Sequence, residues 1–287
     1  MNPAQLFTYS EDRLRALCGL TPKALEALLA AAVPELLARR QQRQERPGRK
    51  RAPGGGRKRG LRPEQEILLA LLYLRHNVAH AVVGELFGVS ADTSENTFHE
   101  VVAALQAVCP AQRWEAEKKG KKSEPAWKPA EEDRLLIDSF ETPVPRPSVE
   151  PAQRRVYSGK KKRHTLKSQV VTDATGEILE LVPGQRGPMA DQKLYEQSGV
   201  AERYPEAEKY GDRGYQGSAG VKVPHKKPKG GELTPEQREE NQEHASVRVY
   251  VEHAIRRIKA FRIMRGDYRL ATGLFPRTAW VVVGLVH

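Results

Sequence analysis

The sequence predicts a protein in two parts: an all-α helix-turn-helix domain, then an α/β domain with a mixed sheet and flanking helices. Up to about residue 110, leucine and valine recur every three or four positions, which is typical of amphipathic helices. Residues 116–133 contain no Leu, Ile or Val and show no period, so they predict a linker. From residue 135, short apolar strands alternate with helices, which is the order of an α/β domain.

The composition is that of a globular and strongly basic chain. Its 287 residues include 48 Lys and Arg against 36 Asp and Glu, a net charge of +12, which together with 39% hydrophobic residues excludes disordered, collagen-like and membrane classes. The longest apolar run, residues 67–74, is too short to cross a bilayer, and Glu11 and Asp12 argue against a signal peptide. We therefore expect a cytoplasmic protein without a membrane partner, in which the isolated Cys18 and Cys109 are reduced and buried.

The basic excess is concentrated in residues 39–60. This stretch holds ten Lys or Arg against one Glu, and its prolines and glycines oppose a continuous helix. It follows short helices expected within residues 1–38, where Thr21 and Pro22 form a helix start. We predict a flexible basic arm that attracts a polyanion, with a merely solvated linker as the alternative. The last basic cluster of the arm supplies candidate DNA contacts: Arg57, Lys58 and Arg59.

Residues 61–110 match the helix-turn-helix pattern. Helices are predicted over 62–75, 79–87 and 91–108. Gly88 lies in the turn, and Ser90 is placed as the N-cap of the third helix. Four apolar residues of that helix would face the core: Phe98, Val101, Val102 and Leu105. Thr93 and Asn96 would then be available to a DNA groove, although any three-helix bundle has a similar pattern.

The second domain, residues 135–287, follows a linker at 111–134. Strands are predicted over 134–140, 161–173, 177–182, 208–212 and 221–224. Helices are predicted over 189–198 and 235–261. A turn at 173–176 joins the second strand to the third as a hairpin. The order of these elements predicts a mixed sheet with helices packed against it.

Three acidic residues are selected by their context. Asp138 and Asp212 each come at the end of a strand, where a buried carboxylate is costly unless a cation or hydrogen bonds compensate it. Glu252 lies within the long helix, flanked by apolar residues. Together they suggest a two-metal phosphodiester site, because carboxylates are ligands for divalent ions. For Glu252 alone, the alternative is an exposed helix face with ion pairs four residues apart.

Basic side chains accompany these acids. Arg248, Arg256 and Lys259 share a helix face with Glu252. A second basic group lies at and beside the start of the second predicted strand: Lys160, Lys161, Lys162, Arg163, His164 and Lys167. These residues would hold a phosphate backbone, or they would form a solvated strand edge that Lys protects from aggregation. No Walker-type motif occurs, so we expect no nucleotide cofactor.

These motifs together resemble the DDE transposases of bacterial insertion sequences. The resemblance rests on Asp138, the stretches 157–171, 211–217 and 224–229, and the helix that carries Arg248, Glu252 and Lys259. It is nearest to the "insertion sequence five" family and its Harbinger-type relatives, and it covers about residues 57–287. It implies an RNase H-like catalytic domain behind the helix-turn-helix domain. Asp138, Asp212 and Glu252 would be the metal-binding triad, and Arg248 and Lys259 match the Arg–Glu–Lys signature.

The sequence departs from the family pattern at three places. Ala245 replaces a tyrosine that the pattern places three residues before Arg248, and Ala190 replaces the histidine before Asp191. Residues 278–287 are apolar and stop where relatives usually run on, so we expect that the gene has been trimmed. The two alanines leave the roles of the missing side chains vacant.

The resemblance implies a transposase of the bacterial nucleoid. It would use Mg²⁺ or Mn²⁺, bind the terminal inverted repeats of its element as double-stranded DNA, cut there and join the freed 3′-hydroxyl to target DNA. Two ends must be held together, so a homodimer is expected. The departures favour a rival, a catalytically inert DNA-binding regulator derived from a transposase. A third possibility is a nuclease that acts on RNA–DNA hybrids.

Overall fold

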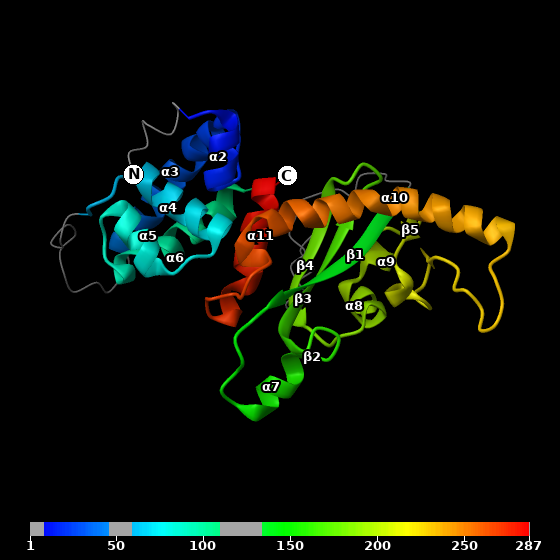
Figure 1. Cartoon of the computed structure of the whole chain (residues 1–287). Helices are drawn as coiled ribbons and strands as arrows, with labels where there is room; N and C mark the ends of the chain where they lie inside the picture. The colour runs from blue at the N-terminus through cyan, green and yellow to red at the C-terminus, as the bar shows by residue number, and fades with distance from the viewer. Residues whose placement is uncertain (1–8, 46–58, 110–133, 287) are drawn as a thin grey trace. The chain divides into compact units, whose positions relative to one another are not determined.

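The computed structural model describes residues 9–45, 59–109 and 134–286 of the chain (Figure 1). The chain divides into two compact units, of which the first combines Met1–Ala111 with Ala260–Val286 and the second comprises Gln112–Lys259. The last segment therefore belongs to the helical unit, whereas the sequence assigned it to the α/β domain. The predictions for 46–58, with Arg57 and Lys58, and for most of the linker at 111–134 lie outside the described residues.

The helical unit begins with α2 (Glu11–Cys18) and α3 (Pro22–Gln44) and continues with α4 (Pro63–His76), α5 (His80–Phe87) and α6 (Ala91–Val108). Helix α3 starts as predicted, because Thr21 caps it by accepting from the backbone N–H of Ala24 at 3.1 Å. It continues through Pro34 to Gln44, so the first part of the expected flexible arm is helical.

Helices α5 and α6 form the predicted helix-turn-helix. Gly88 ends α5 in the left-handed conformation, and Ser90 caps α6 by accepting from the backbone N–H of Thr93 at 3.2 Å. The four apolar residues expected in the core of α6 are all buried: Phe98, Val101, Val102 and Leu105. Thr93 and Asn96 are exposed on its other side. The helix-turn-helix could be predicted from the sequence because the apolar period and the capping residues indicate the same helix boundaries.

The C-terminal segment completes the helical core. After η2 (Arg262–Met264) and η3 (Thr272–Leu274), α11 (Phe275–Val286) packs against α6, with Gly284 so close to Cys109 that a Cβ would lie 2.6 Å from the cysteine Cβ. Most residues of α11 are apolar and buried. A helix that is apolar on most of its surface is stable only when other elements pack against several of its faces. Cys18 and Cys109 are free and buried, as predicted.

In the described part of the chain, no single helix is long and apolar enough to cross a membrane. The bent pair α2 and α3 passes that test by length and composition alone. Both helices bury apolar residues in the helical unit, among them Leu14, Leu25 and Leu36.

The second unit is a mixed sheet flanked by helices, as the sequence predicted. Its strands are β1 (Arg134–Pro143), β2 (Tyr157–Ser158), β3 (Arg163–Thr172), β4 (Ile178–Arg186), β5 (Glu208–Tyr210) and β6 (Val221–Lys222). The order is β2-β3-β1-β5-β6, with β4 also paired to β3. β1 is central: it pairs antiparallel with β3 and parallel with β5.

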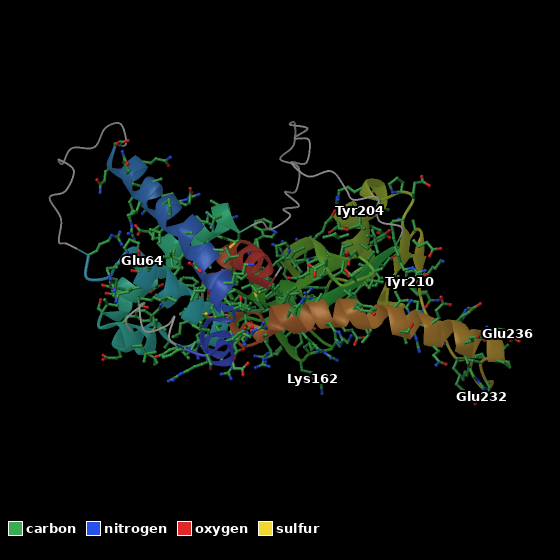
Figure 2. All side chains as sticks on the ribbon, turned by 90° about the horizontal axis from the view of Figure 1, so that it is seen from above. Glu64, Lys162, Tyr204, Tyr210, Glu232 and Glu236 are labelled. Atoms are coloured by element: carbon green, nitrogen blue, oxygen red, sulfur yellow. The ribbon has the colours of Figure 1, made fainter. Side chains whose placement is uncertain are left out.

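Helices cover both faces of β1. Leu135 and Ile137 point to a core shared with Tyr195 of α8 (Asp191–Ser198) and Val200 of α9 (Val200–Arg203). Side chains alternate along a strand, so Asp138 points to the other face, where it contacts Arg248 of α10 (Pro235–Ala260). Figure 1 shows α10 running along the sheet, and Figure 2 shows that its first turns, near Glu236, project beyond the strands. Helix α7 (Glu150–Val156) was not predicted, and it buries no residue.

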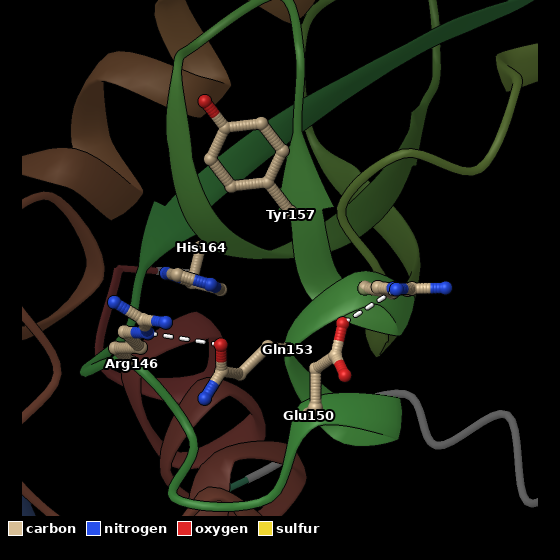
Figure 3. A pocket seen from close by; sticks show the side chains of 6 residues that line it. Arg146, Glu150, Gln153, Tyr157 and His164 are labelled. Carbon is tan, nitrogen blue, oxygen red and sulfur yellow. Dashed lines mark hydrogen bonds and ion pairs between the residues drawn. The ribbon is translucent and has the colours of Figure 1, made fainter.

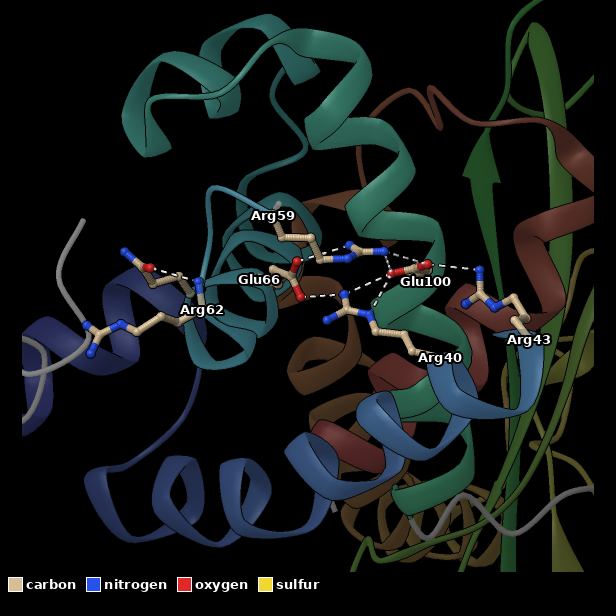
Figure 4. Close-up of polar contacts among 7 residues, drawn as sticks. Arg40, Arg43, Arg59, Arg62, Glu66 and Glu100 are labelled. Atoms are coloured by element: carbon tan, nitrogen blue, oxygen red, sulfur yellow. Dashed lines mark hydrogen bonds and ion pairs between the residues drawn. The ribbon is translucent and has the colours of Figure 1, made fainter. Parts of the chain in front are cut away.

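A network of arginines and two glutamates joins three helices of the first unit (Figure 4). Glu66 of α4, whose side chain is 2% exposed, pairs with Arg40 of α3 and with Arg59. Glu100 of α6 pairs with the same two arginines and with Arg43. Arg59, expected as a DNA contact, thus already has two acidic partners, because the end of the basic segment lies against α4 and α6.

We expect Arg40→Met to lower the free energy of unfolding by about 3 kcal/mol, because it leaves Glu66 buried with only the half-exposed Arg59 as a partner. Urea denaturation of the full chain, followed by circular dichroism, measures this change. Arg15→Met is the matched control, since its pair with Glu11 is exposed and should contribute less than about 1 kcal/mol. Similar losses in the two variants would contradict a structural role for the network.

Candidate active site

The parallel pairing of β1 with β5 brings Asp138 and Asp212 together. The register pairs Leu136 with Tyr210, so two residues further on Asp138 lies level with Asp212, which follows the end of β5. Neighbouring strands are roughly 4.8 Å apart, and the charge of Asp212 acts on Asp138, so the two acids lie close together in the middle of the sheet. The closeness of Asp138 and Asp212 therefore follows from the pairing of their strands and does not depend on the conformation of a long loop.

Asp138 is held by two donors. Its Oδ2 accepts from Nη2 of Arg248 at 2.8 Å, and its Oδ1 accepts from the backbone N–H of Ser139 at 2.7 Å. Burial raises the pKa of Asp138 to about 6; the charges of Asp212 and Asp191 raise it too, while Arg248 lowers it. The carboxyl group therefore changes charge close to neutral pH.

Asp191, at the start of α8, is a third carboxylate beside this pair. Its Oδ1 accepts from the Ser139 hydroxyl at 2.6 Å and from the Lys167 ammonium at 3.0 Å. A Cβ on Gly214 would lie 2.6 Å from Oδ2 of Asp191 and 2.9 Å from Oδ1 of Asp212, so only glycine fits against these two acids without a clash. The sequence had left the role of Asp191 open because the preceding histidine is absent.

One edge of α10 supplies basic residues to the same face of β1. Besides Arg248, Lys259 reaches β1, with its ammonium 5.4 Å from the ring centroid of Phe140. Burial, and then the charge of Lys161, lower the pKa of Lys259. Arg256 lies further round the helix and is exposed.

Glu252 lies on the same helix but does not take part in the ion pair between Arg248 and Asp138. It is exposed on α10, one turn after Arg248, and no hydrogen bond or ion pair joins it to Asp138 or Asp212 in the described structure. Arg248 lies between Glu252 and Asp138, since it shares a helix face with Glu252 and forms an ion pair with Asp138. The place of Glu252 in the triad stays a prediction.

The fit of this site to a divalent ion can be judged from its donors. Within residues 9–45, 59–109 and 134–286, no three His, Cys, Asp or Glu side chains are so arranged that they could hold a metal ion. Arg248 and Lys167 each hold one of the carboxylates. The donors themselves are of the kind that Mg²⁺ and Mn²⁺ prefer, because they are carboxylate oxygens.

The basic residues predicted to contact DNA divide into two groups. Lys167 is 7% exposed and donates to the carbonyl oxygen of Met189 at 2.6 Å as well as to Asp191, so it is a counter-charge to this acid, and its contact with DNA stays a prediction. Arg248 is likewise ion-paired and largely buried. Lys167 on β3 points toward Asp191, and Arg248 on α10 points toward Asp138.

The other group lies at the turn between β2 and β3, where the side chains are exposed: Lys160, Lys161, Lys162 and Arg163. Figure 2 labels Lys162 at the edge of the unit. Next to this hairpin is a pocket of about 410 Å³, in which Arg146, Tyr157 and His164 gather (Figure 3). The Tyr157 and His164 rings meet edge to face, with centroids 5.4 Å apart. The hairpin thus offers positive charge and an exposed ring to a polyanion.

Comparison with known protein families agrees with this geometry. The family described as DDE superfamily endonuclease matches residues 137–286, and the family described as the helix-turn-helix of DDE superfamily endonuclease matches residues 59–110. The chain belongs to the DDE superfamily endonucleases. The first match begins one residue before Asp138 and includes α10. The resemblance stated from the motifs is thereby confirmed at the level of the superfamily.

Two curated relatives of this DDE endonuclease carry transposase names. One, named as a transposase for insertion sequence element IS702 of Microchaete diplosiphon, is 34% identical over 242 residues, which cover 81% of this chain and 82% of the relative. The other, named for insertion sequence element IS112 of Streptomyces albus G, is 30% identical over 217 residues, which cover 75% of each chain. No solved structure matches the chain.

Sequence reasoning missed several residues of the DDE endonuclease site. Ser139 and Gly214 hold or accommodate acids, yet neither residue type is distinctive in a sequence. Tyr215 is fully buried, and its hydroxyl has no hydrogen-bond partner among the described residues. Burial raises the pKa of Tyr215 well above its usual value, and the charges of Asp191, Asp138 and Asp212 add to this effect. The available signal was the three glycines around Asp212, at positions 211, 214 and 217, because glycine allows the backbone to approach other groups closely.

We expect the Asp138 carboxyl to titrate with a midpoint of about 6 in the metal-free protein. Carbon-13 NMR of the side-chain carboxyl measures it. Arg248→Gln should move the midpoint further up, because the guanidinium lowers the pKa of Asp138 by favouring its charged form. A midpoint near 4 in the wild type, or a downward shift in the variant, would contradict the described surroundings of Asp138.

Proposed function

We propose that this DDE endonuclease is the transposase of an insertion sequence. In this proposal it binds the terminal inverted repeats of its element, cleaves DNA there with Mg²⁺ or Mn²⁺, and joins the 3′-hydroxyl to target DNA. The observation that carries the proposal is the pairing of β1 with β5, which sets Asp138 level with Asp212. The names of the two relatives support the biological role.

The residues of the site divide the chemical work between them. Divalent ions bound by Asp138 and Asp212, with Glu252 approaching from α10, would activate the attacking hydroxyl and stabilise the leaving oxygen. Arg248 orients the Asp138 carboxylate through Nη2. Lys259, on the same edge of α10, supplies a positive charge for a DNA phosphate near Phe140. No covalent bond between protein and DNA is required.

DNA would be held by surfaces on each unit. In the helical unit, Thr93 and Asn96 lie exposed in the first turns of α6, the part of such a helix that reads base edges. In the α/β unit, Lys160–Arg163 would contact phosphates, assisted by His164, and Arg256 extends the positive face of α10. Because two DNA ends must be joined, we propose that a homodimer holds them.

A second candidate function is a DNA-binding regulator whose α/β unit is inert. Two observations favour it: Arg248 already occupies one oxygen of Asp138, and Glu252 is exposed. A regulator would bind DNA that carries inverted repeats and would not nick it with either ion. The following cleavage assay therefore separates the two functions.

Asp138→Asn and Asp212→Asn should each reduce cleavage of a supercoiled plasmid carrying the element's inverted repeats by at least about 10³-fold, because each removes a metal-binding carboxylate. Gel electrophoresis with millimolar Mg²⁺ or Mn²⁺ measures nicking, and a mobility shift should show DNA binding within about twofold of the wild type. Glu196→Gln, an exposed acid on α8, is the control and should cleave normally. Wild-type protein that binds the repeats and never nicks them would establish the regulator instead.

Asn96→Ala should weaken binding to the inverted repeat about tenfold, because an asparagine that reads a base contributes roughly 1–3 kcal/mol of discrimination. Fluorescence anisotropy with the repeat and with a scrambled duplex measures it. Affinity for the scrambled duplex should change by less than twofold. An equal loss on both duplexes would show that Asn96 contacts the backbone and does not read sequence.

A further inference from the structure

The pocket of about 410 Å³ beside the β2–β3 hairpin is built by a segment that the core of the unit does not need. Its walls come from residues between β1 and β2 and from the start of β3 (Figure 3). The helix in this segment, α7, buries no residue. The volume lies within the range of roughly 300–1,000 Å³ that is usual for sites of small organic ligands.

Tyr157 forms the aromatic wall of the pocket. The register of β2 and β3 pairs Tyr157 with His164, and the edge-to-face contact of their rings, with centroids 5.4 Å apart, orients the tyrosine. Tyr157 nevertheless remains 46% exposed, on a strand at the end of the sheet order. An oriented ring that is half exposed offers a surface on which another planar group can stack.

The polar lining of the pocket suits the edge of a planar group. Oε1 of Gln153 accepts from Nε of Arg146 at 2.9 Å, and its Nε2 donates to the carbonyl oxygen of Pro147 at 2.8 Å. These bonds fix the amide, which has a second hydrogen and a second lone pair for a ligand. Glu150, which is paired with Arg154, adds carboxylate oxygens. Amides and carboxylates are the groups that pair with the donors and acceptors along the edge of a nucleic-acid base.

Positive charge surrounds this lining. Residues 144–163 contain seven Lys or Arg against a single acid, Glu150. Lys160, Lys161 and Lys162 are exposed at the turn of the hairpin. A neutral aromatic ligand would not use this charge. A nucleotide within a DNA strand would use both parts, the ring for its base and the cations for the phosphates beside it.

The pocket lies within reach of a DNA strand at the aspartates. Five residues of β1 separate Asp138 from Pro143, which pairs with Thr165 at the start of β3. At roughly 3.3 Å per residue the pocket is then roughly 17 Å from Asp138 along the strand, which corresponds to about five nucleotides of a duplex. The charges of both Lys161 and Asp138 act on Lys259, so this cation lies between the two places.

We propose that the pocket binds one unpaired base of the DNA strand that is cleaved, about five nucleotides from the scissile phosphate. The base stacks on Tyr157, its polar edge meets Gln153 and Glu150, and its flanking phosphates contact Lys160–Lys162. This inference rests on the proposed function, since it takes DNA as the ligand. A fully paired duplex offers the hairpin only its phosphates, because its bases are stacked on one another.

Fluorescence anisotropy with two labelled duplexes, measured in EDTA, tests the proposal without cleavage. The duplexes have the same sequence, except that one carries an extra, unpaired adenosine in one strand. The full wild-type chain should bind this duplex at least about fivefold more tightly, because stacking of one base contributes roughly 1–3 kcal/mol. Tyr157→Ala should bind both duplexes equally. Tyr157→Phe should keep the preference, because the ring stacks and the hydroxyl is not needed.

Tyr250→Ala is the matched control. Tyr250 is a tyrosine that is 45% exposed in the same unit, but it lies beside Gly176, at the opposite end of β3 from the pocket. This variant should keep the preference within about twofold. Lys160→Ala should weaken binding of both duplexes by the same factor, since a phosphate contact does not depend on base pairing. Thermal unfolding of each variant verifies the fold.

The outcomes separate this inference from the proposed function. A wild-type chain without the preference, or an equal loss in Tyr157→Ala and Tyr250→Ala, overturns the inference; cleavage at the inverted repeats would then leave the proposed function standing. Displacement of the labelled DNA by an equal concentration of deoxyadenosine monophosphate would show a site for free nucleotides and would also overturn it. If the preference depends on Tyr157 and the protein never nicks inverted-repeat DNA, the inference stands and the transposase proposal fails.

Discussion

The parallel pairing of β1 with β5 sets two carboxylates side by side, and the surrounding structure compensates the repulsion between them. Arg248 reaches Asp138 from α10, the backbone of Gly214 donates to Asp212, and Lys167 holds Asp191. The raised pKa of Asp138 shows that burial outweighs this compensation at one carboxyl group. Acids kept together at such a cost are typical of a site that binds a cation, because a divalent ion would offset both the burial and the repulsion.

The basic excess of the chain serves two physical purposes. Some cations are internal: Lys167 and Arg248 are paired with aspartates, and Arg40 neutralises glutamates between helices. Others are exposed, as at Lys160–Lys162, and present positive charge that phosphates could contact. Net charge alone therefore overstates the surface that DNA can use. Burial distinguishes the two groups, and burial depends on which strand or helix carries each residue.

The sequence predicted most elements, because hydrophobic period and caps are local signals. The helix-turn-helix and five of the six strands, in their order along the chain, follow from such signals, and Asp212 follows the end of a strand as expected. The expectation that Asp138 ends a strand was wrong, because β1 continues through it to Pro143, and the two-residue strand β2 was not predicted. The packing of α11 against α6 could not be predicted, because an apolar helix carries no mark of the unit that buries it. The roles of Lys167 and Arg248 were also beyond the sequence, since a basic side chain looks the same whether it meets a phosphate or a buried aspartate. Asp191 was noticed only through its motif, and its hydrogen-bond partners Ser139 and Lys167 could be identified only from the structure.

Anomalous diffraction from crystals of the full chain soaked in Mn²⁺ tests the central claim most directly. We expect a peak beside the middle of β1 and beyond the end of β5, with carboxylate oxygens of both Asp138 and Asp212 within about 2.5 Å of the ion. Arg248 should then have moved away from Oδ2 of Asp138. An ion bound elsewhere, or no ion while Asp138 and Arg248 remain paired, would contradict the claim that strand pairing builds a metal site.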